Sequence, residues 1–217
     1  MLTLDKVMVD AEPIGSAEPL AAGVAKIRRS GRSRLPVSDS DGRYVGMLAA
    51  SVCARSEATC ADEATAAEPV AAADSPSALL RLFAEQDADT VAVVDRGGQT
   101  VGVADRQLTL KLTASLLGAD APGATIAVTM RTADYEIGRL ATTIEMAGAR
   151  ILSITSSADA DTATAYVKIA QPDPFPVIES LERHGYDATA YTGSYALSEG
   201  DDILRRNYDS LMDYLNI

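Results

Sequence analysis

The sequence predicts a mixed α/β chain: two copies of a small α/β unit, then a βαββαβ unit, then a C-terminal helix. Two observations carry this prediction. First, a stretch near the N-terminus returns fifty-six positions later without a gap, so that Glu12-Pro13-Ile14 reappears as Glu68-Pro69-Val70 and Val45-Gly46 as Val101-Gly102. Second, the pattern after the second copy changes to a different alternation of strands and helices. Because a repeated unit usually cannot bury its apolar face alone, we expect function at an interface between copies.

Both copies are expected to contain a helix, a strand, a tight hairpin turn, a returning strand and a second helix. Apolar residues at helical spacing predict the helices, and valine-rich runs predict the strands. Gly42 and Gly98 supply the positive φ that hairpin turns need. In the first copy (1–58) we expect a helix at 19–29, strands at 33–38 and 43–48, and a short helix at about 50–55. In the second (59–117) we expect helices at 76–86 and 105–117 and strands at 90–95 and 100–103.

The doubled unit resembles a CBS domain. The resemblance rests on Arg34-Leu35-Pro36-Val37-Ser38-Asp39 with Gly42 and Tyr44-Val45-Gly46-Met47-Leu48. Val91-Ala92-Val93-Val94-Asp95 with Gly98 and Val101-Gly102-Val103 match in the second copy. The resemblance implies a tandem CBS pair packed sheet to sheet, with two clefts that hold small regulatory ligands. It marks Arg34 and Pro36 in one copy, and Asp105 and Arg106 in the other, as candidate ligand-binding residues.

The chain departs from the nucleotide-binding pattern of the CBS family. Members that bind adenine nucleotides carry a Ser or Thr after the second strand and an Asp three residues later. The first copy has Ala49 and Val52 at these positions, and the second has Asp105 and Leu108. Asp105 can also be read as the cap of the following helix, and its carboxylate would repel a phosphate. The resemblance therefore implies weak nucleotide binding limited to one cleft.

A glycine- and proline-containing linker at 118–123 separates the repeats from a third segment at 124–192. Alternating and helical patterns there predict the order βαββαβ, a ferredoxin-like unit. The expected elements are strands at 124–130, 150–155, 162–170 and 186–191 and helices at 135–147 and 174–185. The last helix is entered through prolines and closed by Gly185.

This third segment resembles an ACT domain. Asp134, Gly138-Arg139-Leu140 and Gly148-Ala149-Arg150-Ile151 carry the resemblance. It implies binding of an amino acid or similar metabolite between paired copies, with Asp134, Gly138 and Gly148 as candidate ligand-binding residues. The usual proline before the helix is replaced by Ile137, and the Asp sits one place early.

The C-terminal segment, 199–217, is predicted to be an amphipathic helix. Leu204, Tyr208, Leu211 and Leu215 follow at spacings of four, three and four. Its narrow apolar face cannot stabilise an isolated helix, so we expect it to dock on the body or on a partner. With the two preceding domains, it resembles the layout of small stand-alone bacterial CBS–ACT proteins related to the acetoin-utilisation type.

Composition narrows the class of function. The net charge of −12 argues against a nucleic-acid partner and against an anionic membrane surface. The N-terminus has no signal-peptide pattern and no apolar run approaches a membrane span, which indicates a cytoplasmic protein. Cys53 and Cys60 are separated by six residues and form no metal-binding or redox motif, so we expect two free thiols.

Catalytic and metal-binding patterns are absent from the sequence. His184 is the one histidine and is expected at a helix end, where it meets the negative helix terminus. Carboxylate pairs such as Asp39/Asp41 are expected in turns. The basic cluster Arg28-Arg29, Arg32 and Arg34 has two interpretations: cations at a helix C-terminus, or an anion site at the mouth of a cleft.

The main hypothesis is a non-catalytic regulatory protein, acting as a homodimer that senses a small metabolite, either an adenine nucleotide or an amino-acid-like molecule. It needs no resident cofactor or metal. The alternative is a constitutive dimeric scaffold whose clefts bind nothing, which the missing hydroxyl and Asp favour. An enzyme is the third class, and the sequence offers it no catalytic group.

Overall fold

The computed structural model describes residues 4–52 and 57–191 of the 217-residue chain. The chain divides into two compact units, 1–113 and 114–217. The predicted C-terminal helix at 199–217 lies outside the described residues, as does much of the short helix expected at 50–55. Residues 50–52, the described part of this short helix, form a turn and a bend, so the prediction of a helix is wrong there.

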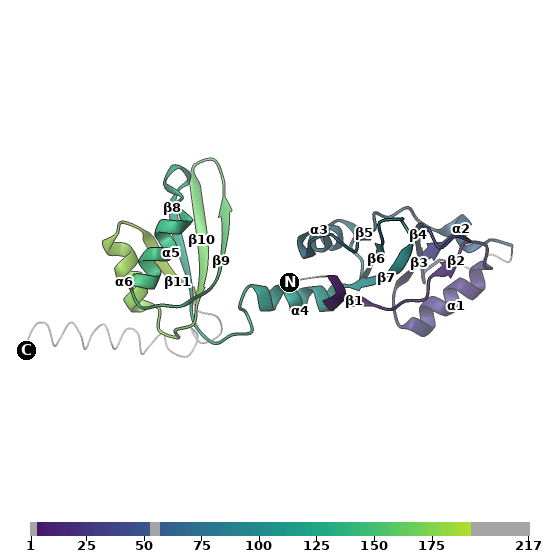
Figure 1. Cartoon of the computed structure of the whole chain (residues 1–217), viewed down its shortest axis with the longest axis horizontal. Helices are drawn as coiled ribbons and strands as arrows, with labels where there is room; N and C mark the ends of the chain where they lie inside the picture. Colours follow the sequence, from purple (N-terminus) through teal and green to yellow (C-terminus); the bar gives the residue numbers. More distant parts are fainter. Residues whose placement is uncertain (1–3, 53–56, 192–217) are drawn as a thin grey trace, which may run out of the picture. The chain divides into compact units, whose positions relative to one another are not determined.

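The first unit contains the repeat (Figure 1), and most of its elements recur at the fifty-six-residue spacing, apart from β1 and α4. The first copy comprises a 3-10 helix η1 (Leu4–Lys6), β1 (Met8–Val9), β2 (Ile14–Gly15), α1 (Leu20–Ser30), β3 (Arg34–Ser38) and β4 (Tyr44–Ala49). The second comprises α2 (Cys60–Glu63), β5 (Val70–Ala71), α3 (Pro76–Gln86), β6 (Thr90–Val94), β7 (Thr100–Asp105) and α4 (Arg106–Leu116). The helices 19–29, 76–86 and 105–117 and the four longer strands are confirmed to within about two residues.

Two sheets carry the two copies. One has the order β2-β3-β4 and the other β1-β7-β6-β5. In both, a hairpin pairs antiparallel and a two-residue strand joins it in parallel: Ile14 lies opposite Val37, and Val70 opposite Val93. The sequence analysis missed β1, β2 and β5, because two residues are too few to show a periodic pattern.

The two hairpin turns have the same geometry. Gly42 and Gly98 both adopt φ of 78°, a conformation that glycine adopts at low cost. In each turn an aspartate carboxylate, from Asp39 or Asp95, accepts backbone N–H groups from the residues that follow it. The turn aspartates are therefore structural, as the sequence predicted.

Each sheet has its own apolar cluster, and each cluster also takes residues from the other copy: Cys60 joins that of the first copy, and Leu4 and Val7 join that of the second. In the first copy α1 contributes Leu20, Val24 and Ile27, the stripe that predicted this helix. In the second copy α3 contributes Leu79, Leu82 and Phe83. The strands β3 and β4 lie beside β6 and β7 (Figure 1), and the packing of β3 on β6 and β7 joins the copies into one unit.

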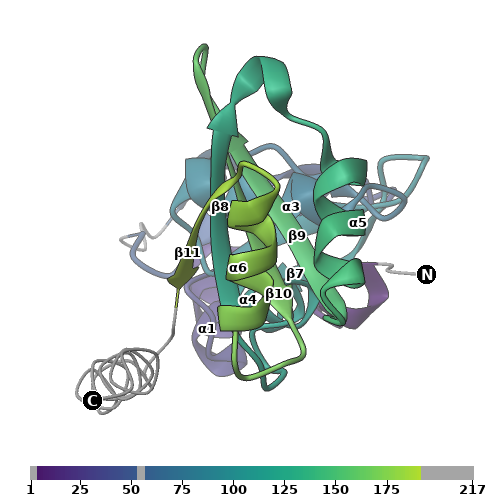
Figure 2. The same cartoon turned by 90° about the vertical axis from the view of Figure 1, so that its left-hand side faces the viewer.

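The second unit has the element order strand, helix, strand, strand, helix, strand. Its elements are β8 (Thr125–Arg131), a 3-10 helix η2 (Thr132–Asp134), α5 (Ile137–Met146), β9 (Ile151–Ala158), β10 (Thr162–Ile169), α6 (Phe175–Arg183) and β11 (Asp187–Tyr191). The antiparallel sheet has the order β11-β8-β10-β9. Both helices cover one face of it (Figures 1 and 2).

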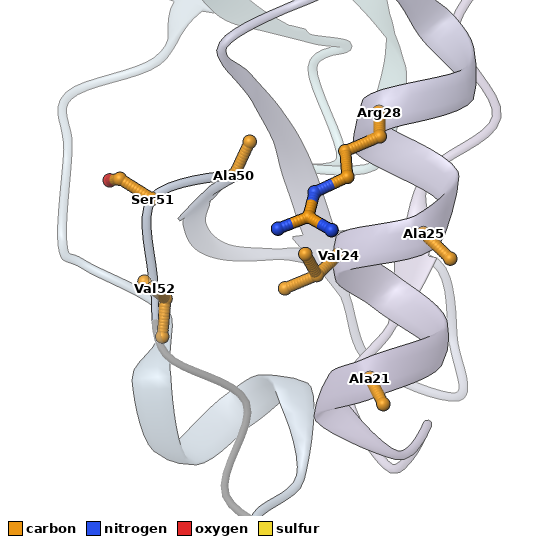
Figure 3. Close-up of a pocket in the computed structure, with 7 residues that line it drawn as sticks. All are labelled: Ala21, Val24, Ala25, Arg28, Ala50, Ser51 and Val52. Atoms are coloured by element: carbon orange, nitrogen blue, oxygen red, sulfur yellow. The ribbon is translucent and has the colours of Figure 1, made fainter.

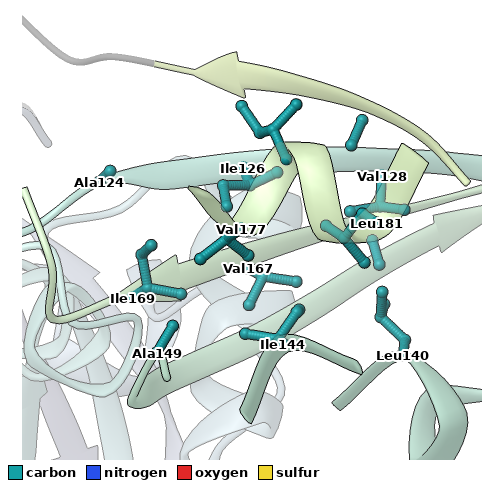
Figure 4. Close-up of a cluster of buried hydrophobic side chains, with 13 residues drawn as sticks. Ala124, Ile126, Val128, Leu140, Ile144, Ala149, Val167, Ile169, Val177 and Leu181 are labelled. Atoms are coloured by element: carbon teal, nitrogen blue, oxygen red, sulfur yellow. The ribbon is translucent and has the colours of Figure 1, made fainter. Parts of the chain in front are cut away.

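The core of the second unit lies between that sheet and its two helices (Figure 4). Ile126 and Val167 point from the strands towards Leu140 of α5 and Leu181 of α6, and all four are fully buried. Truncating a buried Leu to Ala costs about 2–5 kcal/mol, so this cluster is a main source of the unit's stability.

Candidate functional site

Equivalent residues of the two copies meet across a pseudo-twofold axis. At one end, Tyr44 N–H donates to Gly98 O and Thr100 N–H donates to Gly42 O, both at 3.0 Å. The two bonds are equivalent, because Thr100 is the fifty-six-residue counterpart of Tyr44 and Gly98 is that of Gly42. This reciprocity is the mark of an isologous interface, here formed within one chain.

At the other end of the axis, counterparts bond directly. Arg34 Nε donates to Thr90 O at 2.9 Å, and Thr90 Oγ1 donates to Arg34 O at 3.2 Å. Next to them, Ser33 N–H donates to Asp89 Oδ2 at 2.8 Å, and the Ser33 hydroxyl also bonds this carboxylate. The repeat therefore builds two symmetry-related clefts, one on either side of the axis.

One of these clefts is open. We call it the Arg32 cleft, and it has a volume of about 470 Å³. Its lining residues come from the segment before β2, from α1 and from the start of β3. They are Val9, Asp10, Ala11, Glu12, Lys26, Arg29, Ser30, Arg32 and Leu35.

The cleft contains three cations with different partners. Lys26 Nζ donates to Glu18 Oε1 at 2.7 Å, which raises the pKa of Lys26 and lowers that of Glu18. Arg32 Nη1 pairs with Asp105 Oδ2 at 3.1 Å. Arg29 makes no ion pair with any described residue. It is therefore the cation of this cleft that is available to an anionic ligand without breaking an ion pair.

The counterpart cleft differs in both charge and space. We call it the sealed cleft, and define it by the residues fifty-six positions after those of the Arg32 cleft. They are Thr65, Ala66, Ala67, Glu68, Leu82, Glu85, Gln86, Ala88 and Val91. Leu82, Glu85 and Ala88 occupy the positions that correspond to Lys26, Arg29 and Arg32, so none of these three positions carries a cation.

Large side chains from the axis fill the sealed cleft. Arg34 Nη2 donates to Gln86 Oε1 at 2.8 Å, and Gln86 Nε2 donates to Glu68 O at 2.9 Å. The Tyr44 hydroxyl donates to Ala67 O at 2.9 Å. Burial raises the pKa of Tyr44 to about 12 and lowers the pKa of Arg34. Tyr44 therefore stays a hydrogen-bond donor at neutral pH.

Three differences in size explain why one cleft is open and the other closed. The counterparts of Arg34, Gln86 and Tyr44 are Thr90, Ser30 and Thr100. In each case the larger residue occupies the sealed cleft, and of the smaller counterparts Ser30 lines the Arg32 cleft. The open space is thus a consequence of where the two copies differ.

The candidate residues of the first unit have separate environments. Arg34 closes the sealed cleft. Pro36 is buried in β3, opposite Met47. Asp105 binds Arg32 and accepts the Leu108 N–H at 3.0 Å, so it also caps α4, as one interpretation of the sequence anticipated.

Arg106, the fourth candidate of this unit, lies at the surface. Its guanidinium is 3.6 Å from Asp87, whose carboxylate is fully exposed. An exposed pair of this kind contributes little to stability. It offers no enclosed position for a ligand.

The candidates of the second unit lie at different places around α5. Asp134 forms an exposed ion pair with Arg131 at 2.7 Å. Gly138 is exposed in the first turn of α5, whereas Gly148 follows the end of that ten-residue helix with φ of 81°. Gly148 O accepts a hydrogen bond from Gln171 Nε2 at 3.0 Å. The opposite ends of one helix do not form one small-molecule site.

A second hollow in the first unit, of about 540 Å³, lies against α1 (Figure 3). It is lined by Ala21, Val24, Ala25, Arg28, Ala50, Ser51 and Val52. The counterparts of its last three residues form the first turn of α4, whereas 50–52 are not helical. The hollow thus marks a place where the repeat breaks, and the chain continues from it into residues 53–56, which are not described.

The basic cluster noted in the sequence divides between several roles. Arg28 and Arg29 lie in the last turn of α1, where cations complement the helix end. Arg29 and Arg32 also line a cleft, and the interpretation of an anion site there stays a prediction. Lys26 and Ser30 were missed, because only the tertiary structure shows which face of α1 borders the cleft.

The other chemistry-bearing residues have structural positions. His184 Nδ1 lies 2.7 Å from Ser180 O at the end of α6. Cys60 is buried and free, while Cys53 lies outside the described residues. In residues 4–52 and 57–191, no three His, Cys, Asp or Glu side chains gather as metal ligands would. None of the described helices has the length and apolar character needed to cross a bilayer.

Comparison with known proteins gave matches among solved structures alone. No family model matches, and no curated protein matches. A CBS domain pair/ACT domain protein from Thermotoga maritima is 15% identical, covers 52% of this chain and 98% of its own, and has a TM-score of 0.49. The protein CBSX2 in complex with AMP is 15% identical, with coverages of 53% and 98% and a TM-score of 0.45.

The CBS domain of a bacterial CNNM/CorC family Mg²⁺ transporter in complex with ATP is also similar. It is 20% identical, covers 50% of this chain and 84% of its own, and has a TM-score of 0.43. Structures of CBS-domain proteins are thus similar to about half of this chain.

Proposed function

We propose that this chain is a non-catalytic regulatory protein whose first unit is a CBS pair with one ligand-competent cleft. The ligand is a small anionic metabolite, of which an adenine nucleotide is the leading example. The observation that carries the proposal is the contrast between the two clefts. The Arg32 cleft is open and holds Arg29, which makes no ion pair with any described residue, whereas its counterpart is occupied by the Arg34 side chain, which donates to Gln86 there.

The second unit is proposed to be an ACT-like domain with a ferredoxin-like fold. Its element order and its sheet order β11-β8-β10-β9 support this assignment. Because Gly138 and Gly148 lie at opposite ends of α5, an amino-acid-like ligand at these residues has less support than a ligand in the Arg32 cleft.

Binding of AMP, followed by calorimetry on the full chain, tests the proposed cleft. We expect one site per chain. Replacing Arg29 by Glu, the residue at the counterpart position, should abolish binding. The matched variant Glu85→Arg adds a cation to the sealed cleft and should create no second site. Two sites per chain, or undiminished binding by Arg29→Glu, would contradict the proposal.

A constitutive scaffold is the second candidate function. The closed counterpart cleft and the Arg32–Asp105 pair favour it, because both occupy with protein groups the positions that a ligand would use. In this case AMP, ATP and amino acids should all leave the melting temperature unchanged. A ligand at 100 times its Kd would instead stabilise the fold by about 2.7 kcal/mol.

For either function we propose a cytoplasmic homodimer with no nucleic-acid or membrane partner. The acidic composition supports the last point. Light scattering on the full chain at micromolar concentration tests the oligomeric state. A monomeric mass across that range would contradict the proposed dimer.

A further inference from the structure

We propose that Arg32 and Asp105 form a relay that reports occupancy of the Arg32 cleft to α4, the helix that both units share. The inference rests on the proposed function of that cleft and adds a route by which binding changes the rest of the chain. It is carried by three observations: the two bonds of one carboxylate, the absence of this pair from the other copy, and the position of α4.

The Asp105 carboxylate joins the cleft to the start of α4. Its Oδ2 pairs with Arg32 Nη1 at 3.1 Å, and its Oδ1 accepts the Leu108 N–H at 3.0 Å. The second bond is a helix cap, since the first backbone N–H groups of a helix have no partner within it. Both side chains are largely shielded from solvent, with exposed fractions of 16% for Arg32 and 24% for Asp105.

The pair occurs in one copy alone. The counterparts of Arg32 and Asp105 are Ala88 and Ala49, which can form neither bond. The other copy thus has the same strands and hairpin without this ion pair. The Arg32–Asp105 pair lies beside the open cleft and has no equivalent beside the sealed one. We therefore associate the pair with the cleft that can receive a ligand.

The helix α4 extends from the first unit into the second. It runs from Arg106 to Leu116, and the boundary between the units falls after Thr113. Within the second unit, the Ser153 hydroxyl of β9 donates to Leu117 O at 2.7 Å, directly after the end of α4. The relay is therefore proposed to act on α4 itself, and its readout is the stability of that helix.

An anionic ligand in the cleft competes with Asp105 for the Arg32 guanidinium. Once the guanidinium binds the ligand's anion, Asp105 has lost its counter-charge and faces a like charge. The carboxylate then turns away, and the Leu108 N–H loses its cap. Arg32 thus has two alternative partners, and the ligand shifts the balance between them, which is the physical requirement for coupling between distant sites.

Hydrogen exchange of the full chain, measured by mass spectrometry on peptides covering 106–117, tests the relay. AMP should raise exchange of the first turns of α4 about fivefold, the change expected when a helix cap is lost. Adenosine, which has no phosphate, is the matched ligand and should leave it unchanged. Without ligand, Arg32→Gln should produce the same rise as AMP, whereas Arg96→Gln, the loss of an exposed hairpin arginine, should not.

The outcomes separate this inference from the proposed function. If calorimetry shows AMP binding while exchange of 106–117 stays the same, the relay is wrong and the cleft stands. If AMP does not bind, the proposed nucleotide function fails, and Arg32→Gln still decides whether Arg32 controls α4. Exchange equal to wild type in Arg32→Gln overturns the relay in either case.

Discussion

Arg34 and its repeat counterpart Thr90 exchange hydrogen bonds across the pseudo-twofold axis, each bonding the other's backbone carbonyl, at 2.9 and 3.2 Å. Two equivalent positions hold residues of very different size. The longer one reaches past the axis to Gln86 and closes one cleft, while the shorter one leaves the other open. The function of the repeat thus depends on its asymmetry.

Replacing Arg34 by Ala should destabilise the first unit by about 1–3 kcal/mol. The change removes the bonds to Thr90 O and Gln86, and leaves a half-buried amide without its partner. Urea denaturation of the full chain measures the loss. Arg43→Ala, in the exposed hairpin, is the matched control and should fall within about 0.5 kcal/mol of wild type. Equal stabilities of the two variants would contradict the role given to Arg34.

Replacing Asp105 by Ser should tighten AMP binding about tenfold, a difference of about 1.4 kcal/mol. Serine keeps a helix-capping oxygen but removes the negative charge that competes with a phosphate for Arg32. Calorimetry on the full chain measures the change in Kd. Weaker binding by this variant would show that Asp105 contacts the ligand favourably.

Stability should fall in acid through Asp89. Burial raises the pKa of this carboxyl, but its bonds from Ser33 and Thr90 outweigh that effect, so the pKa lies below its ordinary value. Because the folded-state pKa is depressed, the ionised Asp89 carboxylate stabilises the fold in full above the unfolded-state pKa of about 3.9. This stabilisation is lost as the pH falls through the folded-state pKa. The window is therefore below about pH 4.

The variant Asp89→Asn should be less stable than wild type at pH 6 by about 1 kcal/mol. The gap should narrow as the pH falls below about 4. Denaturation at pH 6, 4 and 3 tests this, with Asp41→Asn, a hairpin carboxylate, controlling for the loss of one negative charge. A gap that stays constant over this range would rule out Asp89 as the source.

Gly123 should not tolerate a side chain. It adopts φ of 128°, and a Cβ atom there would lie 2.0 Å from Ile169 O, a backbone atom. Gly123→Ala should therefore cost about 3 kcal/mol or more and unfold the second unit at a lower temperature. Gly138→Ala is the matched control, because a Cβ there meets nothing within 4 Å and the backbone is helical. Similar melting temperatures for both variants would refute the argument.

Much of the fold could be predicted because its signals are local. The stripe of Leu20, Val24 and Ile27 predicts α1 by its spacing alone, and the turns at Gly42 and Gly98 follow from their residue types. The spacing of the repeat is also a property of the sequence. Strands of two residues, such as β2, escaped this reasoning since they are defined by their neighbours and not by a pattern of their own.

The sequence by itself thus determined the repeat, most of its elements and the basic cluster that supplies two of the cations in the cleft, Arg29 and Arg32. The tertiary structure alone decided which cleft is open. Arg34 closes a cleft through Gln86, a residue of the other copy, and Asp105 meets Arg32 across seventy-three positions of sequence. These partners are set by the packing of one copy on the other, and no local pattern along the chain encodes that packing.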